Sequence, residues 1–218
     1  MPLQQRSSDL DPKALSSGQQ ARLTRILDAA ETSFVANGLS GATMEGIARD
    51  ASVAKATVYG YLPSKDAAFR AVAERLAGRI EQAALPWLVP RPDDKLSSEG
   101  VVSHITNALV AKQSIVFKVV RRSPHADELL LARGSLVAER FAQVDRQIID
   151  GMALVLQSAT VAKAPNDVSP WDDCDGYLRI AELCFRGAVG VANSAPSQAQ
   201  MEEDLRDFVQ QFLSLTVG

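Results

Sequence analysis

Apolar residues recur every three or four positions along most of this chain, which is the spacing of an amphipathic α-helix. The first predicted helix covers about residues 19–37. It follows Ser17-Gly18-Gln19-Gln20, which has the form of a capping box, and it stops before Gly38, since glycine ends helices without steric cost. Residues 114–120 are rich in β-branched side chains and resemble a strand in isolation, but no partner strand is expected elsewhere. The pattern therefore predicts an all-α protein.

Eight further helices are predicted, separated by short polar or proline-containing connections. They cover about residues 44–50, 54–61, 64–80, 98–121, 124–134, 135–159 and 172–189, with a last helix that begins near residue 197. Four of them start at a candidate serine cap, namely Ser64, Ser98, Ser123 or Ser197. Residues 165–172 are expected to form a loop. The whole pattern gives nine helices and no strands.

The last predicted helix carries one continuous apolar stripe. Its members are Leu205, Phe208, Val209, Phe212 and Leu213. Such a stripe needs a partner surface, and homodimers often supply it by a self-complementary patch. We therefore expect a twofold homodimer that forms through the last two helices.

Composition limits the class of protein. Hydrophobic residues make up 46% of the chain and charged residues 22%, as in ordinary globular proteins. No secretory signal and no apolar run of roughly 20 residues is present, so we expect a cytoplasmic protein that does not bind membranes. Cys174 and Cys184 fit no metal motif and are expected to be small buried hydrophobic residues, with a redox or ligand role as the alternative. The net charge is −3, but residues 19–70 carry six basic and five acidic side chains, a local charge of +1.

The segment 43–61 has the pattern of two short helices joined by a tight corner. Ala48 is small enough for the first helix to cross the second closely, and four apolar side chains fall at offsets that face a shared core. These four are Ile47, Ala51, Val53 and Val58. The corner residue is Ser52, where such corners usually have glycine, and a left-handed conformation there costs about 1 kcal/mol. The pattern indicates a helix-turn-helix at about residues 43–62.

In a helix-turn-helix, the second helix enters the major groove of DNA. Lys55 and Thr57 are then placed to donate to bases or phosphates, and Tyr59, Tyr61 and Lys65 to reach the phosphate backbone. Small residues on the same helix, Ala56 and Gly60 among them, permit close approach to thymine methyl groups. The alternative is a helical hairpin inside an all-α core with two half-buried tyrosines.

About fifty residues, from Ala21 to Arg70, resemble the TetR family of transcriptional regulators in order and spacing. The matching positions are Ile26-Leu27-Asp28-Ala29-Ala30, Phe34, Gly38, Thr43, Ile47-Ala48, Val53, Lys55, Thr57, Tyr59, Tyr61 and Pro63-Ser64-Lys65. The chain departs from the family pattern at Ser52, Ala54, Ala56, Gly60 and Leu62.

The resemblance implies a three-helix DNA-binding domain followed by a six-helix effector and dimerisation bundle. On this basis we expect the DNA-binding domain over residues 19–80 and the ligand-binding domain over 81–218. Residues 1–18 are polar and show no periodicity, so we expect them to form a flexible leader. It also implies that Thr43 and Lys65 contact phosphates, and that residues 55–61 form the recognition helix. The expected partners are a palindromic double-stranded operator, a small-molecule effector and a second copy of the chain.

The effector is expected to bind inside the C-terminal bundle. Candidate lining residues are aromatic or polar outliers in apolar helices, although each alone also fits ordinary core packing: Trp87, His104, Phe117, Met152, Trp171 and Phe185. His104 and His125 lack a nearby carboxylate cluster, so neither a metal nor a cofactor is expected. No paired carboxylates, nucleophile elbow or phosphate loop argues for an enzyme. A helical dimer that has lost DNA binding and serves only as a ligand-binding or protein-binding module remains the alternative.

Overall fold

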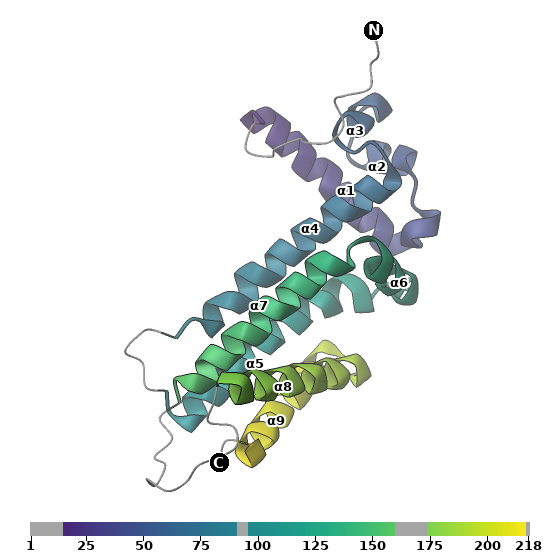
Figure 1. Cartoon of the computed structure of the whole chain (residues 1–218). Helices are drawn as coiled ribbons and strands as arrows, with labels where there is room; N and C mark the ends of the chain where they lie inside the picture. The colour runs from purple at the N-terminus through teal and green to yellow at the C-terminus, as the bar shows by residue number, and fades with distance from the viewer. Residues whose placement is uncertain (1–14, 91–95, 160–173, 217–218) are drawn as a thin grey trace, which may run out of the picture. The chain divides into compact units, whose positions relative to one another are not determined.

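The computed structural model describes residues 15–90, 96–159 and 174–216. Over these residues the regular structure is helical, and the β contact within them is an isolated parallel bridge between Leu96 and Ala159. For the described residues, the predicted all-α fold with nine α-helices is confirmed (Figure 1). The nine are α1 (Ser17–Gly41), α2 (Met44–Asp50), α3 (Lys55–Tyr61), α4 (Lys65–Ala84), α5 (Ser98–Val116), α6 (Ala126–Leu136), α7 (Ala138–Gln157), α8 (Cys174–Ser194) and α9 (Gln198–Thr216).

The helices form two compact units. The first contains the described residues up to Leu76 together with Val119–Ala138. The second contains Ala77–Lys118 and the described residues from Glu139 onward. The division falls within α4, and α6 packs with the N-terminal helices, although the predicted boundary at residue 80 assigned it to the C-terminal part.

Helix α1 begins slightly earlier than the sequence pattern indicated. The capping box uses Ser16 and Gln19, because the Ser16 hydroxyl accepts from the Gln19 amide while the Gln19 side chain accepts from the Ser16 amide. The predicted box one residue later, which began at Ser17, is therefore wrong. Gly38 has φ 70° and ψ 177°, so the regular helix is interrupted there as expected, and a further turn follows to Gly41.

The first unit has a core that joins α1 to the helices that follow it. Ile26, Ile47 and Val58 are fully buried. Phe34 and Phe69 meet edge to face with ring centroids 5.5 Å apart. Burial of these side chains packs α2 against α1 and α3 against α2, which fixes the direction in which the short helices present their outer surfaces.

An arginine on α4 adds a polar connection to α1. Arg75 donates to the Asp28 carboxylate at 2.6 Å and to the Glu31 carboxylate at 2.7 Å. The same guanidinium also donates to the Leu27 carbonyl at 3.2 Å. Because one planar group bonds three acceptors along α1, it sets the register between the two helices.

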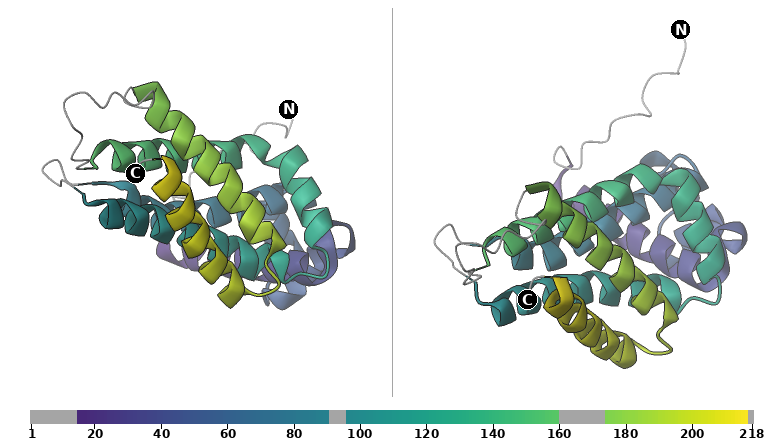
Figure 2. Two further views of the ribbon diagram at one scale, coloured as in Figure 1. Left: turned by 90° about the horizontal axis from the view of Figure 1, so that it is seen from below. Right: turned by 60° about the horizontal axis from the view of Figure 1, so that its bottom comes forward.

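The second unit is built around α5, α8 and α9, which pack against one another. Figure 2 shows α8 and α9 running alongside each other. Leu205, Val209 and Leu213 of α9 are buried inside this unit of a single chain. The α9 stripe was expected to need a second copy of the chain as its partner surface. This argument is wrong, because α5 and α8 of the same chain already cover most of the stripe.

Cys184 lies at the centre of α8 and is fully buried, as the sequence indicated. Burial raises the pKa of its thiol to about 12, so it stays protonated and unreactive at neutral pH. Cys174 begins α8, and its side chain lies outside the described residues.

Several predicted helix ends shift by a few residues. The cap of α5 is Ser97, whose hydroxyl accepts from the Gly100 amide, and the predicted cap at Ser98 is wrong. The chain widens into a π-helix over Phe117–Arg121 and regains α-helix only at Ala126. Ser123 therefore does not cap a helix directly. The predicted loop at 165–172 lies outside the described residues.

Within the described parts of the chain, no helix is both long and apolar enough to cross a membrane.

Candidate nucleic-acid interface

Helices α2 and α3 form the predicted pair of short helices joined by a tight corner. They span Met44–Asp50 and Lys55–Tyr61 and pack against each other. Ser52 turns the corner with φ 53°, so the predicted left-handed conformation of this non-glycine residue is confirmed. The Thr43 hydroxyl caps α2 by accepting from the Gly46 amide at 3.0 Å. This geometry is that of a helix-turn-helix.

One face of α3 is buried and the other is open to solvent. Val58 is fully buried and attaches the helix to the core of the first unit. All eight predicted DNA-binding residues remain accessible: Thr43, Lys55, Ala56, Tyr59 and Gly60 are exposed, and Thr57, Tyr61 and Lys65 are half-buried. The open surface therefore carries two amines, several hydroxyl donors and two residues small enough for close approach to a partner.

Lys55 forms an ion pair with Glu45 across the hairpin, so the two short helices are joined electrostatically. The hydrogen bond to Lys55 holds the pKa of Glu45 below its ordinary value, and the reciprocal bond raises the pKa of Lys55. The Lys55 ammonium also lies 5.7 Å from the ring centroid of Tyr59. A partner that binds Lys55 must therefore compete with the Glu45 carboxylate.

Lys65 begins α4, and its ammonium donates to the Ser40 carbonyl at 3.2 Å. An ammonium has three donors, so this bond leaves two for an external acceptor. The Thr43 hydroxyl uses its oxygen to cap α2 and keeps its own proton to donate. Both groups fit the role of phosphate contacts implied by the sequence resemblance.

Sequence reasoning missed two residues beside this surface, Ser40 and Glu128. The Glu128 carboxylate accepts from the Ser40 amide at 2.6 Å and from the Ser40 hydroxyl. The two residues are separated by 88 positions, and no local pattern around either one signals the contact. It follows from the packing of α6 against α1 within the first unit.

The six residues proposed for an effector pocket have different surroundings. Trp87 is 43% exposed, and its carbonyl oxygen lies 2.6 Å from Nδ1 of His104. Met152 is fully buried, and Phe185 lies over the ammonium of Lys112 at 4.2 Å from the ring centroid. Phe117 begins the π-helix, and Trp171 lies outside the described residues.

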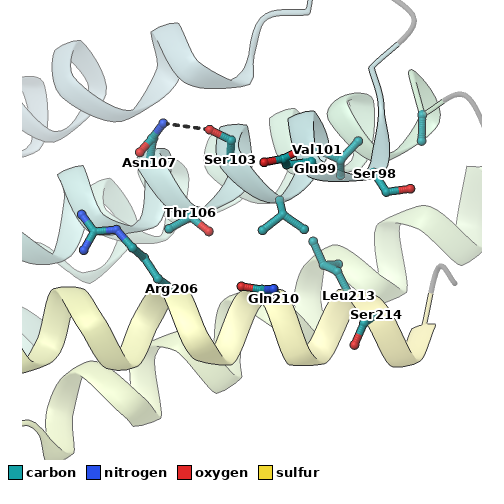
Figure 3. A pocket seen from close by; sticks show the side chains of 12 residues that line it. Ser98, Glu99, Val101, Ser103, Thr106, Asn107, Arg206, Gln210, Leu213 and Ser214 are labelled. Carbon is teal, nitrogen blue, oxygen red and sulfur yellow. Dashed lines mark hydrogen bonds between the residues drawn. The ribbon is translucent and has the colours of Figure 1, made fainter.

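A separate cavity of about 680 Å³ lies between α5 and α9. Figure 3 shows side chains of α5, such as Thr106, facing side chains of α9, such as Arg206 and Gln210. None of the six proposed pocket residues lines it. In the part of the chain that the structure describes, no group of three or more histidine, cysteine or acidic side chains is placed to hold a metal ion.

Comparisons with known proteins agree with this geometry. Residues 26–72 match the family model described as "Bacterial regulatory proteins, tetR family". The chain is 34% identical over 127 residues to the HTH-type transcriptional regulator SrpR of Pseudomonas putida, a match that covers 57% of this chain and 58% of SrpR. It is also 34% identical over 124 residues to the uncharacterized HTH-type transcriptional regulator TtgW of the same species, a match that covers 56% of this chain and 90% of TtgW.

The fold also matches solved structures. A TetR-family regulator from Mesorhizobium loti superposes with a TM-score of 0.63 at 19% identity, over 92% of this chain and 98% of that one. The accessible helix-turn-helix and the family match identify a DNA-binding transcriptional regulator. Proteins of this class are not enzymes. The chain belongs to the TetR family of bacterial transcriptional regulators.

The start of α3 is weakly capped, which gives a stability prediction. Ala54 occupies the N-cap position and makes no side-chain hydrogen bond to the helix. Replacing Ala54 by serine should satisfy one free amide and raise the free energy of unfolding by about 1 kcal/mol, measured by urea unfolding. The matched control is Ala56→Ser, which places the same hydroxyl inside α3 and should give no gain. Equal stabilisation by both variants would contradict the capping argument.

Proposed function

We propose that this chain is a homodimeric transcriptional repressor that binds a palindromic operator and releases it when a small molecule binds. The observation that carries the proposal is the accessible face of α3, which is held by the buried Val58 and flanked by Lys55 and Lys65. Membership of the TetR family supports the same function. We also propose that the protein acts in the cytoplasm, because the genes that it regulates are bacterial.

The residues of the hairpin divide into two roles. Lys65 and Thr43 contact phosphates, together with Tyr59 and Tyr61, and supply affinity that depends on salt. Lys55 and Thr57 reach base edges from the N-terminal part of α3. Ala56 and Gly60 allow that helix to approach the groove closely.

The experiment that tests this proposal is a selection of random duplex DNA by the purified protein, repeated with two variants. The wild type should enrich a palindrome. Thr57→Ala should change the enriched bases, while Lys65→Ala should weaken binding to all sequences and lower the salt slope by about 1. An unchanged slope for Lys65→Ala would show that the phosphate assignment is wrong.

Glu45 provides a further test because it competes with DNA for Lys55. Glu45→Gln should strengthen binding to any duplex by about threefold, since it removes a negative charge near the phosphates and frees the ammonium. The control is Glu45→Asp, which keeps the charge and should stay near wild-type affinity. Titration of a labelled duplex measures both. Weaker binding by Glu45→Gln would contradict the competition between Glu45 and DNA. It would indicate that the ion pair orients Lys55 for its contact with DNA.

The dimer is proposed to form through the outer faces of α8 and α9. Leu183 on α8 is 53% exposed and Leu215 on α9 is 86% exposed. Phe208 and Phe212 are half-buried beside them, with ring centroids 5.6 Å apart. The Phe208 ring packs against Gly187 of α8, so Leu183 and Leu215 are the apolar side chains that stay exposed after the α9 stripe has packed within one chain.

Light scattering tests the dimer with a matched pair of variants. The wild type should have the mass of two chains at micromolar concentration, and Leu183→Glu should have the mass of one. Leu154→Glu is the control, because Leu154 on α7 is 54% exposed and lies outside the proposed interface. A wild-type mass of one chain, or loss of the dimer in the control alone, would contradict the proposed interface.

The effector is proposed to bind in the second unit, which contains five of the six predicted pocket residues within its described part: Trp87, His104, Phe117, Met152 and Phe185. Repression requires that the effector bind one arrangement of the DNA-binding units better than the other. A small molecule that weakens operator binding should therefore raise the melting temperature of the DNA-free protein.

A further inference from the structure

Three contacts between a side chain and the main chain join Val119–Ala138 to the DNA-binding helices of the first unit. The Ser123 hydroxyl donates to the Val35 carbonyl on α1 at 2.6 Å. Arg70 on α4 donates to the Leu136 carbonyl at the end of α6 at 2.6 Å. The third contact is that of Glu128 with Ser40. Because of these contacts, α6 is part of the structure that supports the hairpin.

The Glu128 contact is specific in its geometry. One carboxylate oxygen accepts both the amide and the hydroxyl of Ser40, and the other lies 3.9 Å from Nδ1 of His125. The bonds from the Ser40 hydroxyl and amide hold the pKa of Glu128 below its ordinary value, so the group is ionised at neutral pH. Gly38 makes the approach possible, since a Cβ atom at this position would overlap the carboxylate.

Ser40 also contacts the residue that is proposed to bind phosphate. Its carbonyl oxygen accepts from the Lys65 ammonium at 3.2 Å. Ser40 therefore lies between Glu128 on one side and Lys65 on the other, and it precedes the α2 cap Thr43 by three residues. A change in the position of Ser40 would be passed directly to the Lys65 ammonium.

We propose that Glu128 is a positioning residue for DNA binding, which holds Ser40 so that the Lys65 ammonium is fixed for its phosphate contact. The inference rests on the proposed function. Lysine has a flexible side chain, and a side chain that is already ordered loses less conformational entropy when it binds. Glu128 acts through Ser40 and Lys65 and does not itself touch DNA.

The test measures affinity for the selected operator in a set of single and double variants. Glu128→Ala should bind about tenfold more weakly, because both bonds to Ser40 are lost. Glu128→Gln should restore binding to within about threefold, since its amide oxygen still accepts from the Ser40 amide. Asp127→Ala is the control, because Asp127 is an exposed acid on the first turn of the same helix, and it should bind like the wild type.

A double variant separates positioning from a general effect on the fold. In the background of Lys65→Ala, the further change Glu128→Ala should have almost no effect, because the group that it positions is absent. Ser40→Ala loses only the hydroxyl bond to Glu128 and should weaken operator binding about threefold. This variant replaces Glu128→Ala in the test if Glu128→Ala does not fold. Melting temperatures of all variants report whether each one is folded.

The outcomes distinguish this inference from the proposed function. If the wild type binds an operator and Glu128→Ala binds it equally with the same salt slope, Glu128 has no positioning role and the DNA-binding function stands. Additive losses from Lys65→Ala and Glu128→Ala would also overturn the inference, since Glu128 would then act independently of Lys65. A folded wild type that binds no duplex would overturn the proposed function and the positioning role with it.

Discussion

Replacing Lys112 by alanine is expected to lower the free energy of unfolding by about 3 kcal/mol. The Lys112 side chain is 5% exposed, its ammonium lies 3.0 Å from the Asp145 carboxylate, and it also faces the ring of Phe185. Alanine deprives Asp145 of this cation in the interior of the second unit. The expected loss is at the lower end of the range for buried ion pairs because the Asp145 side chain is 27% exposed.

Urea unfolding measures this loss, and two further variants test its cause. Lys112→Met with Asp145→Leu replaces the pair by apolar groups and should recover most of the stability, because no buried charge remains. Lys118→Ala removes an exposed lysine two residues after the end of α5 and should change stability by less than about 0.5 kcal/mol. Equal losses from Lys112→Ala and Lys118→Ala would show that the ion pair is not important for the fold.

The second large effect is expected at Gly38. Its φ of 70° and ψ of 177° lie in a region that is almost restricted to glycine, so Gly38→Ala should cost about 2 kcal/mol in backbone strain alone. The new Cβ would also overlap the Glu128 carboxylate, so the variant should lose operator affinity as well as stability.

Gly78→Ala is the matched control for this substitution. Gly78 lies within α4, and a Cβ there meets nothing within 4 Å. Alanine is the better helix former by about 1 kcal/mol, so this variant should be more stable than the wild type. The two glycine substitutions should therefore have opposite signs in thermal unfolding. A stabilised Gly38→Ala would contradict the backbone geometry at the end of α1.

The helix-turn-helix was predictable because its signals are local. Helix α2 has the bounds that the sequence indicated, Met44–Asp50, and α3 differs by one residue because Ala54 is its cap. Core positions such as Ile47 and Val58 follow from spacing over a few residues, and the left-handed Ser52 follows from the length of the corner. Most of the candidate DNA-binding surface could therefore be derived from a short stretch of sequence.

Features that depend on contacts between distant segments could not be predicted. The pattern of α6 gives no sign that it packs with α1, and Glu128 resembles any other acid on a first turn. The α9 stripe looked unpartnered because periodicity shows that a face is apolar and does not show which helix covers it. The same limit applies to the candidate pocket residues, since the sequence pattern did not distinguish the fully buried Met152 from Trp87, which is 43% exposed.

The central claim is that the α2–α3 hairpin of a dimer binds a specific DNA sequence. The most direct measurement is equilibrium binding of the wild type to its selected palindrome and to a scrambled duplex at two salt concentrations. We predict that the palindrome binds at least about 10³-fold more tightly and that its affinity falls steeply as salt rises. Equal affinity for the two duplexes, or no binding by a folded dimer, would contradict the claim and favour a ligand-binding or protein-binding module without DNA recognition.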